Sequence, residues 1–364
     1  MKYAASGAAV LGLLLAATCG GLASDAALAQ DWEPEFAGGK LQPLPDGFPA
    51  GPITVVAAGA EDSAAGVLAQ RLFEFSISNS PVKINVEFRP DFATYGSWDA
   101  LKHAAEAEGG GEGYVNVIFE SPDDLITLHT GSVTQDIGVG LDDLTEVVTV
   151  EDHRFVVVQC KEAGWEPTWE ALVRQIKDHP GEVRYAGGAP GDRLDLTFAY
   201  YMDVQGLGGL YDKAAIGHVD AGDVAARTAA VVGCDADITV ADMEQLTNLQ
   251  KAKEVDMILV TGNTRLRGRD NDVPTAADVG MTDDPMSRTM QVVVPASVDP
   301  LHVRWLSALW AKTTTWSYFV ARRNLDEPDN LSNVLDGEAS AAWNDHTDAV
   351  IGALTEKLGL GAGQ

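Results

Sequence analysis

The chain has 364 residues, and 54 acidic side chains against 25 basic ones give it a formal net charge of −29. A charge of this size and sign repels nucleic acids and anionic membrane surfaces, so both are disfavoured as partners. We expect the acidic side chains to form a solvated surface. The length exceeds what one hydrophobic core usually organises, and two lobes are therefore expected.

The first residues have the three-part layout of a secretory signal. Lys2 supplies a positive start, Ala8 to Ala17 is apolar, and Ala27-Leu28-Ala29 offers small residues for cleavage before Gln30. Residues 1–29 are accordingly predicted to be a signal peptide, which directs the chain to the periplasm. No later segment of the sequence is apolar enough to predict a membrane span.

The three cysteines bear on export and on disulfide content. Cys19 lies within the predicted signal and could carry a lipid anchor, but Ala16-Ala17-Thr18 before it is a poor match to a lipoprotein signal. Only Cys160 and Cys234 remain after the predicted cleavage. An oxidising compartment permits one bridge between them, and the sequence leaves both a disulfide and two buried thiols open.

Residues 30–51 are rich in Pro, Gly and acidic residues and form a lead-in to the fold. Ile53 to Ala57 is then a β-branched run, followed by a small-residue turn and by apolar residues at helical spacing from Ala64 to Phe75. Similar units recur, with strands at Ile84 to Phe88, Val115 to Phe119, Phe155 to Val158, Val183 to Tyr185, Ala236 to Val240, Val255 to Val260 and Met290 to Val294. Helices are predicted at Trp98 to Ala107, from near Pro122, and at Thr168 to Lys177, Asp195 to Met202, Asp223 to Val232, Pro300 to Arg323 and Glu338 to Leu358. Strands alternating with helices predict an α/β fold of parallel sheets with helices on their faces.

The helical stretch from Pro300 to Arg323 is unusually aromatic. Such residues could form a membrane-surface or stacking element, but no basic run accompanies them. We expect them to pack in the core, because a helix that covers a sheet needs bulky residues at spacings of three and four. The aromatic side chains are Trp305, Trp310, Trp316, Tyr318 and Phe319.

Two loops between a predicted strand and a helix have the composition of ligand-binding loops. In α/β sheets, ligands bind at the carboxyl ends of strands, where N–H groups of the next helix can hold a carboxylate, and small residues let the backbone approach a ligand closely. Either loop could instead be a tight turn that serves only packing. The first loop comprises Ala58, Gly59, Ala60, Glu61, Asp62 and Ser63, and the second Ala186, Gly187, Gly188, Ala189, Pro190, Gly191 and Asp192. Ser121, Asp223 and Asp237 complete the predicted ligand-binding set.

The sequence lacks the motifs of common enzymes and metal sites. It has no Gly-x-Ser-x-Gly elbow and no Gly-Lys-Ser/Thr phosphate loop, and its first loop lacks the three glycines of a dinucleotide fingerprint. The acidic pairs Asp123-Asp124 and Asp142-Asp143 are expected to be helix caps and turns rather than acid/base pairs. No cofactor and no metal site are expected, because the histidines are scattered without a ligand spacing. They are His103, His129, His153, His179, His218, His302 and His346.

A series of short motifs runs in a fixed order along the chain. Trp169-Glu170-Ala171-Leu172 precedes His179-Pro180-Gly181-Glu182-Val183-Arg184-Tyr185 and the second loop. After the loop come His218-Val219, Gly233-Cys234-Asp235-Ala236-Asp237, Asp272-Val273-Pro274-Thr275-Ala276-Ala277-Asp278-Val279-Gly280 and Val292 to Pro300. Leu68-Ala69-Gln70-Arg71-Leu72 and Phe88-Arg89-Pro90 lie upstream. This order resembles the Bug family, the TctC-like extracytoplasmic receptors of tripartite tricarboxylate transporters. The family's middle reads Asn-Pro-Gly-x-Leu-x-Tyr-Gly-Ser, and a later segment reads Asp-Val-Pro-Thr-x-x-Glu-x-Gly.

The resemblance implies a two-lobed fold of the type II periplasmic-binding-protein or Venus flytrap kind. Residues 52–154 and 257–364 would form lobe 1, and residues 155–256 would form lobe 2. The lobes would close over a small-molecule solute by a hinge motion, and membrane transporter subunits would be the protein partners. Family members hold a carboxylate on the first loop and another polar group on the second, mostly through backbone amides and water. A monomeric receptor without enzymatic activity is therefore expected.

Both loops depart from the family pattern. The usual Pro-Gly-Gly-x-x-Asp appears as Ala58-Gly59-Ala60-Glu61-Asp62, and the Ser/Thr and His positions of the second loop appear as Asp192 and Asp195. Added negative charge disfavours a doubly charged anion, so a monocarboxylate, an amino-bearing acid or a neutral polar solute is expected. Two alternatives stay open: a sensor module for a receptor kinase, and an exported enzyme on the same fold.

Overall fold

The computed structural model describes residues 32–92, 94–131, 133–243, 246, 253–266, 272–282, 284–326 and 331–361. The predicted signal peptide, its cleavage site and Cys19 lie outside these residues. In the described ranges, none of the helices combines the length and the apolar character that a membrane span requires.

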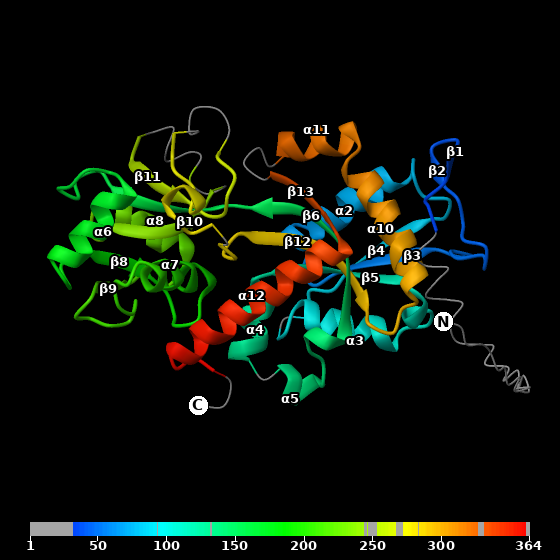
Figure 1. Cartoon of the computed structure of the whole chain (residues 1–364), viewed down its shortest axis with the longest axis horizontal. Coiled ribbons are helices and arrows are strands. Elements are labelled where there is room, and N and C mark those ends of the chain that lie inside the picture. The colour runs from blue at the N-terminus through cyan, green and yellow to red at the C-terminus, as the bar shows by residue number, and fades with distance from the viewer. Residues whose placement is uncertain are drawn as a thin grey trace, which may run out of the picture.

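The larger sheet has six strands in the order β13-β6-β12-β5-β3-β4. Strands β3 (Ile53–Ala57), β4 (Ile84–Phe88) and β5 (Val115–Ser121) are parallel to one another, and β4 lies at the edge of the sheet. β12 (Arg288–Pro295) is antiparallel to both β5 and β6 (Leu144–His153), and β13 (Leu331–Asp336) pairs with β6 at the edge. This sheet forms the right-hand part of the molecule in Figure 1.

Helices cover both faces of the larger sheet. On one face, α2 (Ala64–Ser76), α10 (Pro300–Thr314) and α11 (Ser317–Asp326) bury apolar side chains that include Trp305, Trp310 and Phe319. On the other face, α3 (Ser97–Glu106), α4 (Asp123–Thr130) and α5 (Val133–Ile137) form a second cluster around the fully buried Trp98. The interior strands β3 and β5 are largely apolar because both of their faces are covered.

The smaller sheet has five strands in the order β11-β7-β10-β8-β9. These strands are β7 (Phe155–Cys160), β8 (Arg184–Gly187), β9 (Gly217–Asp220), β10 (Ile238–Asp242) and β11 (Val255–Val260). One face packs against α6 (Trp169–Asp178) and α7 (Arg193–Val204), and the other against α8 (Val224–Val232). This sheet lies on the left in Figure 1.

Two segments connect the sheets. β6 ends at His153 and β7 begins at Phe155, so Arg154 alone separates a strand of one sheet from a strand of the other. The chain returns between β11 and β12. Helix α12 (Gly337–Lys357) packs on β6 and α4 and reaches across to the smaller lobe (Figure 1), where Ile351 and Leu354 join the core that includes α7.

The structure corrects several expectations about elements. Strands β6, β9 and β13 were not predicted. The helix expected from Pro300 to Arg323 is divided, because α10 ends at Thr314 and α11 begins at Ser317. Its aromatic residues are only partly core: Trp305, Trp310 and Phe319 are fully buried, whereas Tyr318 is 65% exposed.

The lead-in before β3 is ordered and packed. The short strands β1 (Phe36–Ala37) and β2 (Lys40–Leu41) form a hairpin, and Leu41, Leu44 and Phe48 are buried in the core of the larger lobe. Among the described residues, single helical turns also lie at Gly110–Glu112, Leu141–Asp143 and Ala277–Val279.

Cys160 and Cys234 form a disulfide with a Cα–Cα distance of 5.4 Å. The bond joins the end of β7 to the residue that follows the C-cap of α8, so it ties this helix to its sheet. The sequence had left two free thiols as an equal alternative.

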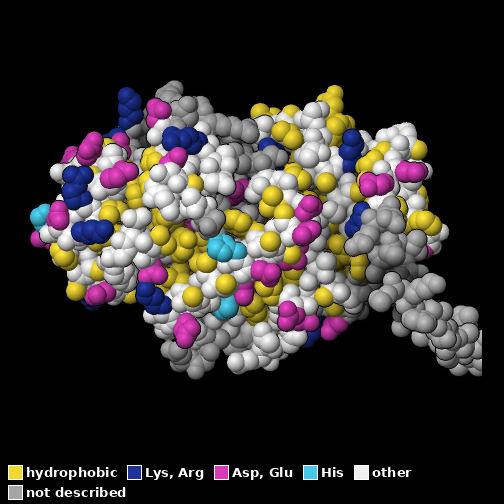
Figure 2. Space-filling model, in the orientation of Figure 1, with side chains coloured by type: hydrophobic (Ala, Val, Ile, Leu, Met, Phe, Trp, Pro, Cys, Tyr) yellow, Lys and Arg dark blue, Asp and Glu magenta, His cyan; other side chains and the backbone are white. Residues whose placement is uncertain are grey.

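Acidic side chains are spread over both lobes on the face drawn in Figure 2, not gathered in one place. This distribution is what a solvated acidic surface requires.

Candidate functional site

The carboxyl ends of the parallel strands of both sheets lie at the crossing between the lobes. In the larger sheet, Ser121 at the end of β5 pairs with Thr289, next to Arg288, which pairs with His153 at the end of β6. In the smaller sheet, Asp242 at the end of β10 pairs with Phe155 at the start of β7. The loops that follow β3 and β8 therefore extend from edges that face the other lobe.

The first loop is shaped by the cap of helix α2. The Ser63 hydroxyl accepts a hydrogen bond from the Gly66 N–H at 3.1 Å and donates one to the Ala60 carbonyl at 2.7 Å. Gly59 has φ +155°, and a Cβ atom there would lie 2.6 Å from the Ser63 hydroxyl oxygen. Glycine is thus required for the cap, while Ala60, Glu61 and Asp62 are exposed.

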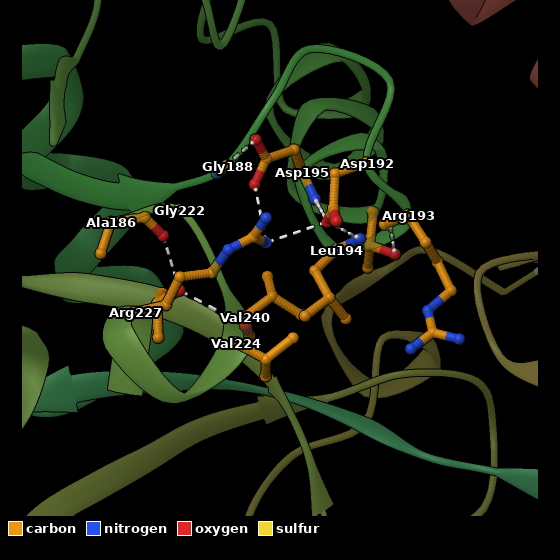
Figure 3. Close-up of polar contacts among 12 residues, drawn as sticks. Ala186, Gly188, Asp192, Arg193, Leu194, Asp195, Gly222, Val224, Arg227 and Val240 are labelled. Atoms are coloured by element: carbon orange, nitrogen blue, oxygen red, sulfur yellow. Dashed lines mark hydrogen bonds and ion pairs between the residues drawn. The ribbon is translucent and has the colours of Figure 1, made fainter. Parts of the chain in front are cut away.

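The second loop is held by its own Asp192 and by Asp195 of helix α7 (Figure 3). Asp192 caps helix α7 by accepting the Leu194 N–H at 2.9 Å. Asp195, which is fully buried, accepts the Gly188 N–H at 3.0 Å and the Tyr185 hydroxyl at 2.9 Å. The Gly188 amide, which was expected to face a ligand, is therefore already bound by a carboxylate of the chain.

Arg227 of helix α8 neutralises part of this negative charge (Figure 3). One guanidinium nitrogen donates to Asp192 at 2.9 Å and to Asp195 at 3.1 Å, and the Arg227 side chain is 2% exposed. Burial raises the pKa of the Asp195 carboxyl, although the Arg227 charge and the Tyr185 hydrogen bond act in the opposite direction. Arg227 thus compensates part of the negative charge that Asp192 and Asp195 bring to this loop.

The two glycines of the second loop make room for side chains of the protein itself. A Cβ atom on Gly188 would lie 1.9 Å from a guanidinium nitrogen of Arg227, and one on Gly187 would lie 2.5 Å from Nε2 of His218. His218 follows Gly217 on β9, beside β8. Neither Arg227 nor His218 was predicted as a site residue. The signal available for Arg227 was that it is the one charged residue of helix α8.

A group of charged side chains joins the lobes near these loops. Arg193, at the start of α7, forms ion pairs with Asp123 of α4 at 2.7 Å and with Asp242 at 3.5 Å, and its guanidinium lies 4.4 Å from the centroid of the Phe155 ring. Burial would lower the pKa of Arg193, but the two carboxylates outweigh it and raise that pKa. Arg288 lies 3.6 Å from Glu120 and 4.0 Å from Asp123.

The other predicted site residues are brought together only in part. Asp223 caps α8 at the same strand edge as the second loop, by accepting the Ala226 N–H at 2.8 Å. Gly191 faces α4, since a Cβ atom there would lie 3.9 Å from a methyl group of Thr130.

Four further positions complete the set. Ser121 is buried at the end of β5, and its hydroxyl has no hydrogen-bond partner among the described residues. Ala189 is exposed in the second loop, whereas Ala58 is half-buried in the first. Asp237 lies just before β10, where it binds Arg184. The structure thus places Asp237 at the amino end of the strand, away from the interlobe edge.

The described residues include no group of three or more His, Cys, Asp or Glu side chains that could hold a metal ion.

Comparisons with known proteins identify the fold. No protein-family model matches the chain, and no curated protein matches its sequence. A TctC solute-binding protein from Polaromonas superposes with a TM-score of 0.68 at 18% identity, over 85% of this chain and 99% of that one. The periplasmic binding protein BugD superposes with a TM-score of 0.56 at 15% identity, over 86% and 99%. An R. palustris protein with adipate gives a TM-score of 0.58 at 15% identity, over 86% and 98%.

These similarities confirm the two-lobed α/β fold of periplasmic binding proteins that the motif order predicts. The resemblance to TctC and Bug proteins is likewise confirmed at the level of the fold, and it extends over nearly the whole length of those proteins.

Proposed function

We propose that the protein is a periplasmic solute-binding receptor that holds a small organic carboxylate or related polar solute between its lobes. It would deliver this solute to the membrane subunits of a tripartite tricarboxylate-type transporter. The observation that carries the proposal is the pair of loops, 58–63 and 187–192, which extend from facing strand edges of a TctC-like and Bug-like fold. Export through the predicted signal peptide belongs to the same proposal.

The predicted lobe boundaries also belong to this proposal. Residues 155–256 would move as one lobe, and residues 52–154 with 257–364 as the other. The single-residue connection at Arg154 and the return between β11 and β12 are the two places where the chain would bend. Hinges of this kind are a few residues at the ends of elements.

The geometry of the loops narrows the solute. At the first loop, N–H groups at the start of α2 can bind a carboxylate. At the second loop, the Gly188 amide is bound by Asp195, and two carboxylates share one guanidinium. A second carboxylate on the solute would meet net negative charge there. We therefore expect a monocarboxylate, an amino-bearing acid or a neutral polar solute to bind more tightly than a dicarboxylate.

A thermal-shift and calorimetry screen tests the proposal. The probes are acetate, lactate and alanine, with malate and adipate as dicarboxylates, because structural relatives were determined with bound malate and adipate. A ligand that binds only the folded state raises the melting temperature. A well-folded protein that responds to none of a broad panel of organic acids, amino acids and neutral solutes would contradict the proposal.

Variants locate the binding. Gly59→Ala would displace the Ser63 cap and is expected to weaken binding, whereas Gly51→Ala is the matched control because a Cβ atom there meets nothing within 4 Å. Turnover of the bound compound would instead identify an enzyme. Normal uptake with lost induction in a deletion strain would identify a sensor.

A further inference from the structure

A pocket of about 630 Å³ lies at the crossing between the lobes. This volume is within the range of about 300–1,000 Å³ that is usual for small-molecule sites. Its walls include Arg154, the segment 262–265 after β11, Asp284 and Ser287 before β12, and Trp343 of α12. None of its lining residues belongs to the loops 58–63 and 187–192.

The floor of this pocket contains a buried ion pair with unused hydrogen-bonding capacity. Asp152 and Arg154 are 6% and 3% exposed, and Oδ2 of the first lies 3.0 Å from Nη2 of the second. Arg154 also donates to the Thr261 carbonyl at 2.5 Å and to the Ser287 hydroxyl at 3.1 Å. Within the described part of the chain, Oδ1 of Asp152 and Nε of Arg154 have no partner.

The indole N–H of Trp343 is a third group of the pocket without a hydrogen-bond partner among the described residues. This nitrogen is buried, and the Trp343 side chain lines the pocket from α12. Buried polar groups are almost always paired with protein or water. A bound molecule that supplies two hydrogen-bond acceptors and one hydrogen-bond donor can satisfy all three groups of this pocket.

Asp284, the second acidic residue of the pocket, already has hydrogen-bond partners within the protein. Asp284 accepts hydrogen bonds from the Gly262 N–H at 2.6 Å, the Tyr201 hydroxyl at 2.7 Å and the Met286 N–H at 3.0 Å. Arg265 at the rim is paired with Asp278 at 3.0 Å. Burial raises the pKa of the Asp152 and Asp284 carboxyls.

We propose that this pocket binds an uncharged polyhydroxylated solute, of the monosaccharide or polyol class. Asp152 and Arg154 neutralise each other, so a charged ligand would be buried there without a counter-charge. A hydroxyl group both donates and accepts, and it can therefore bond to Oδ1 of Asp152, Nε of Arg154 and the Trp343 indole. The Trp343 ring supplies an apolar surface for the C–H face of such a solute.

Titration of the purified protein with glucose and with mannitol, followed by tryptophan fluorescence, tests this site. We expect a saturable change at millimolar concentration. Trp343→Phe removes the indole N–H and should weaken binding by about tenfold, the loss expected for one hydrogen bond to a buried group. Trp316→Phe is the matched control, because Trp316 does not line the pocket, and it should leave the affinity unchanged.

A second variant blocks the pocket without disturbing the core. Ala342 is an exposed residue of α12 that lines the pocket, and Ala342→Trp should abolish the response to both solutes. Ala321→Trp, on an exposed position of α11, is the control. No saturable response in the wild type, or a response that both pocket variants retain, would overturn the proposal.

The organic-acid screen is run on the same samples. Ala342→Trp should keep its response to organic acids, because the loops 58–63 and 187–192 lie outside the pocket. The two screens therefore test the organic-acid site at the loops and the polyol site in the pocket independently of each other.

Discussion

Arg227 determines the charge of the second loop. It is the guanidinium that contacts both Asp192 and Asp195, and it is buried with Asp195. Arg227→Gln would leave a buried carboxylate without its counter-charge, and removal of one partner from a buried ion pair costs about 3–5 kcal/mol. We expect the free energy of unfolding in urea to fall by this amount.

The control for this prediction is Lys161→Gln. Lys161 pairs with Asp256 on the surface, where the two side chains are 40% and 27% exposed. Surface ion pairs contribute about 1 kcal/mol or less. If Arg227→Gln lost no more stability than Lys161→Gln, the charge network of the second loop would not stabilise the fold.

Asp152 predicts a pH dependence of stability. Burial raises its pKa from 3.8 to about 6, with a further contribution from Asp284, although Arg154 and His153 act in the opposite direction. The folded state therefore binds this proton more tightly than the unfolded state. The contribution of Asp152 to stability is greatest below about pH 4 and is lost as the pH rises through about 6, which amounts to roughly 3 kcal/mol.

Comparison with Asp152→Asn isolates this effect, since the amide does not titrate. Urea unfolding of both proteins at a series of pH values gives the difference in their free energies of unfolding. The wild type should lose stability relative to the variant between about pH 4 and pH 7. A difference that stays constant with pH would show that the Asp152 carboxyl has its ordinary pKa in the folded protein.

At the level of residues, the sequence indicated the positions of the loops better than their chemistry. The small residues at 187 and 188 predicted that a ligand approaches the backbone closely. In the structure, the side chains of His218 and Arg227, which come from other elements, take this position. Asp237 lies beside a strand end, yet at the amino end, where it binds Arg184. In both cases the role of the residue depends on a side chain that is distant in sequence, and local composition does not indicate such partners.

Among the elements, β6 shows why some strands were missed. Its sequence includes Glu146, Glu151 and Asp152, which look like solvated residues. In the fold, Asn344 donates to Glu146, Arg71 pairs with Glu151, and Arg154 pairs with Asp152. The apolar strands and amphipathic helices, by contrast, were predicted from their periodicity, because burial of their faces needs no specific partner.

The division between α10 and α11 has a local cause. Thr313, Thr314 and Thr315 end α10, and each hydroxyl donates to a backbone carbonyl three or four residues earlier. β-branched residues with such bonds weaken a helix and favour its end. The aromatic spacing continued through this point, so periodicity alone predicted one helix.

The disulfide that joins α8 to β7 is expected to stabilise the fold. Cys160 and Cys234 are 74 residues apart in sequence, and a bond that closes a long loop stabilises mainly by restricting the unfolded chain. Replacing both cysteines by serine should reduce the free energy of unfolding by about 2–4 kcal/mol. Thermal unfolding with and without a reductant measures this loss.

The reductant serves as the control. It should lower the melting temperature of the wild type toward that of the double variant, and it should leave the variant itself unchanged. Equal melting temperatures of the oxidised wild type and the variant would show that the bond is absent or contributes nothing to stability.

At the scale of the whole molecule, motif order predicted the two-lobed arrangement because it follows the succession of strands and helices. The contacts that hold the lobes together were not predicted. α12 joins the smaller lobe through Ile351, Leu354 and an ion pair between Lys357 and Asp203. Arg193 joins the lobes near the loops through Asp123. Such contacts depend on side chains that meet only after both lobes have folded.

The ion pair between Arg193 and Asp123 is expected to favour the arrangement in which the lobes are in contact. Arg193→Gln removes the 2.7 Å contact as well as the pair with Asp242. A partly buried pair of this kind contributes about 1–2 kcal/mol. This corresponds to a factor of about 5–30 in the equilibrium between the arrangement with the lobes in contact and one with the lobes apart. A ligand that needs contact from both lobes should bind more weakly by up to this factor.

Small-angle scattering and calorimetry of the same samples test this prediction. Without ligand, Arg193→Gln should have a larger radius of gyration than the wild type, and saturating ligand should remove the difference. Lys357→Gln is the control, because its pair with Asp203 also joins the lobes but the two side chains are 60% and 44% exposed and should contribute little. Equal radii and equal affinities for the wild type and Arg193→Gln would show that packing of α4 and α12 against α7, not this ion pair, sets the position of the lobes.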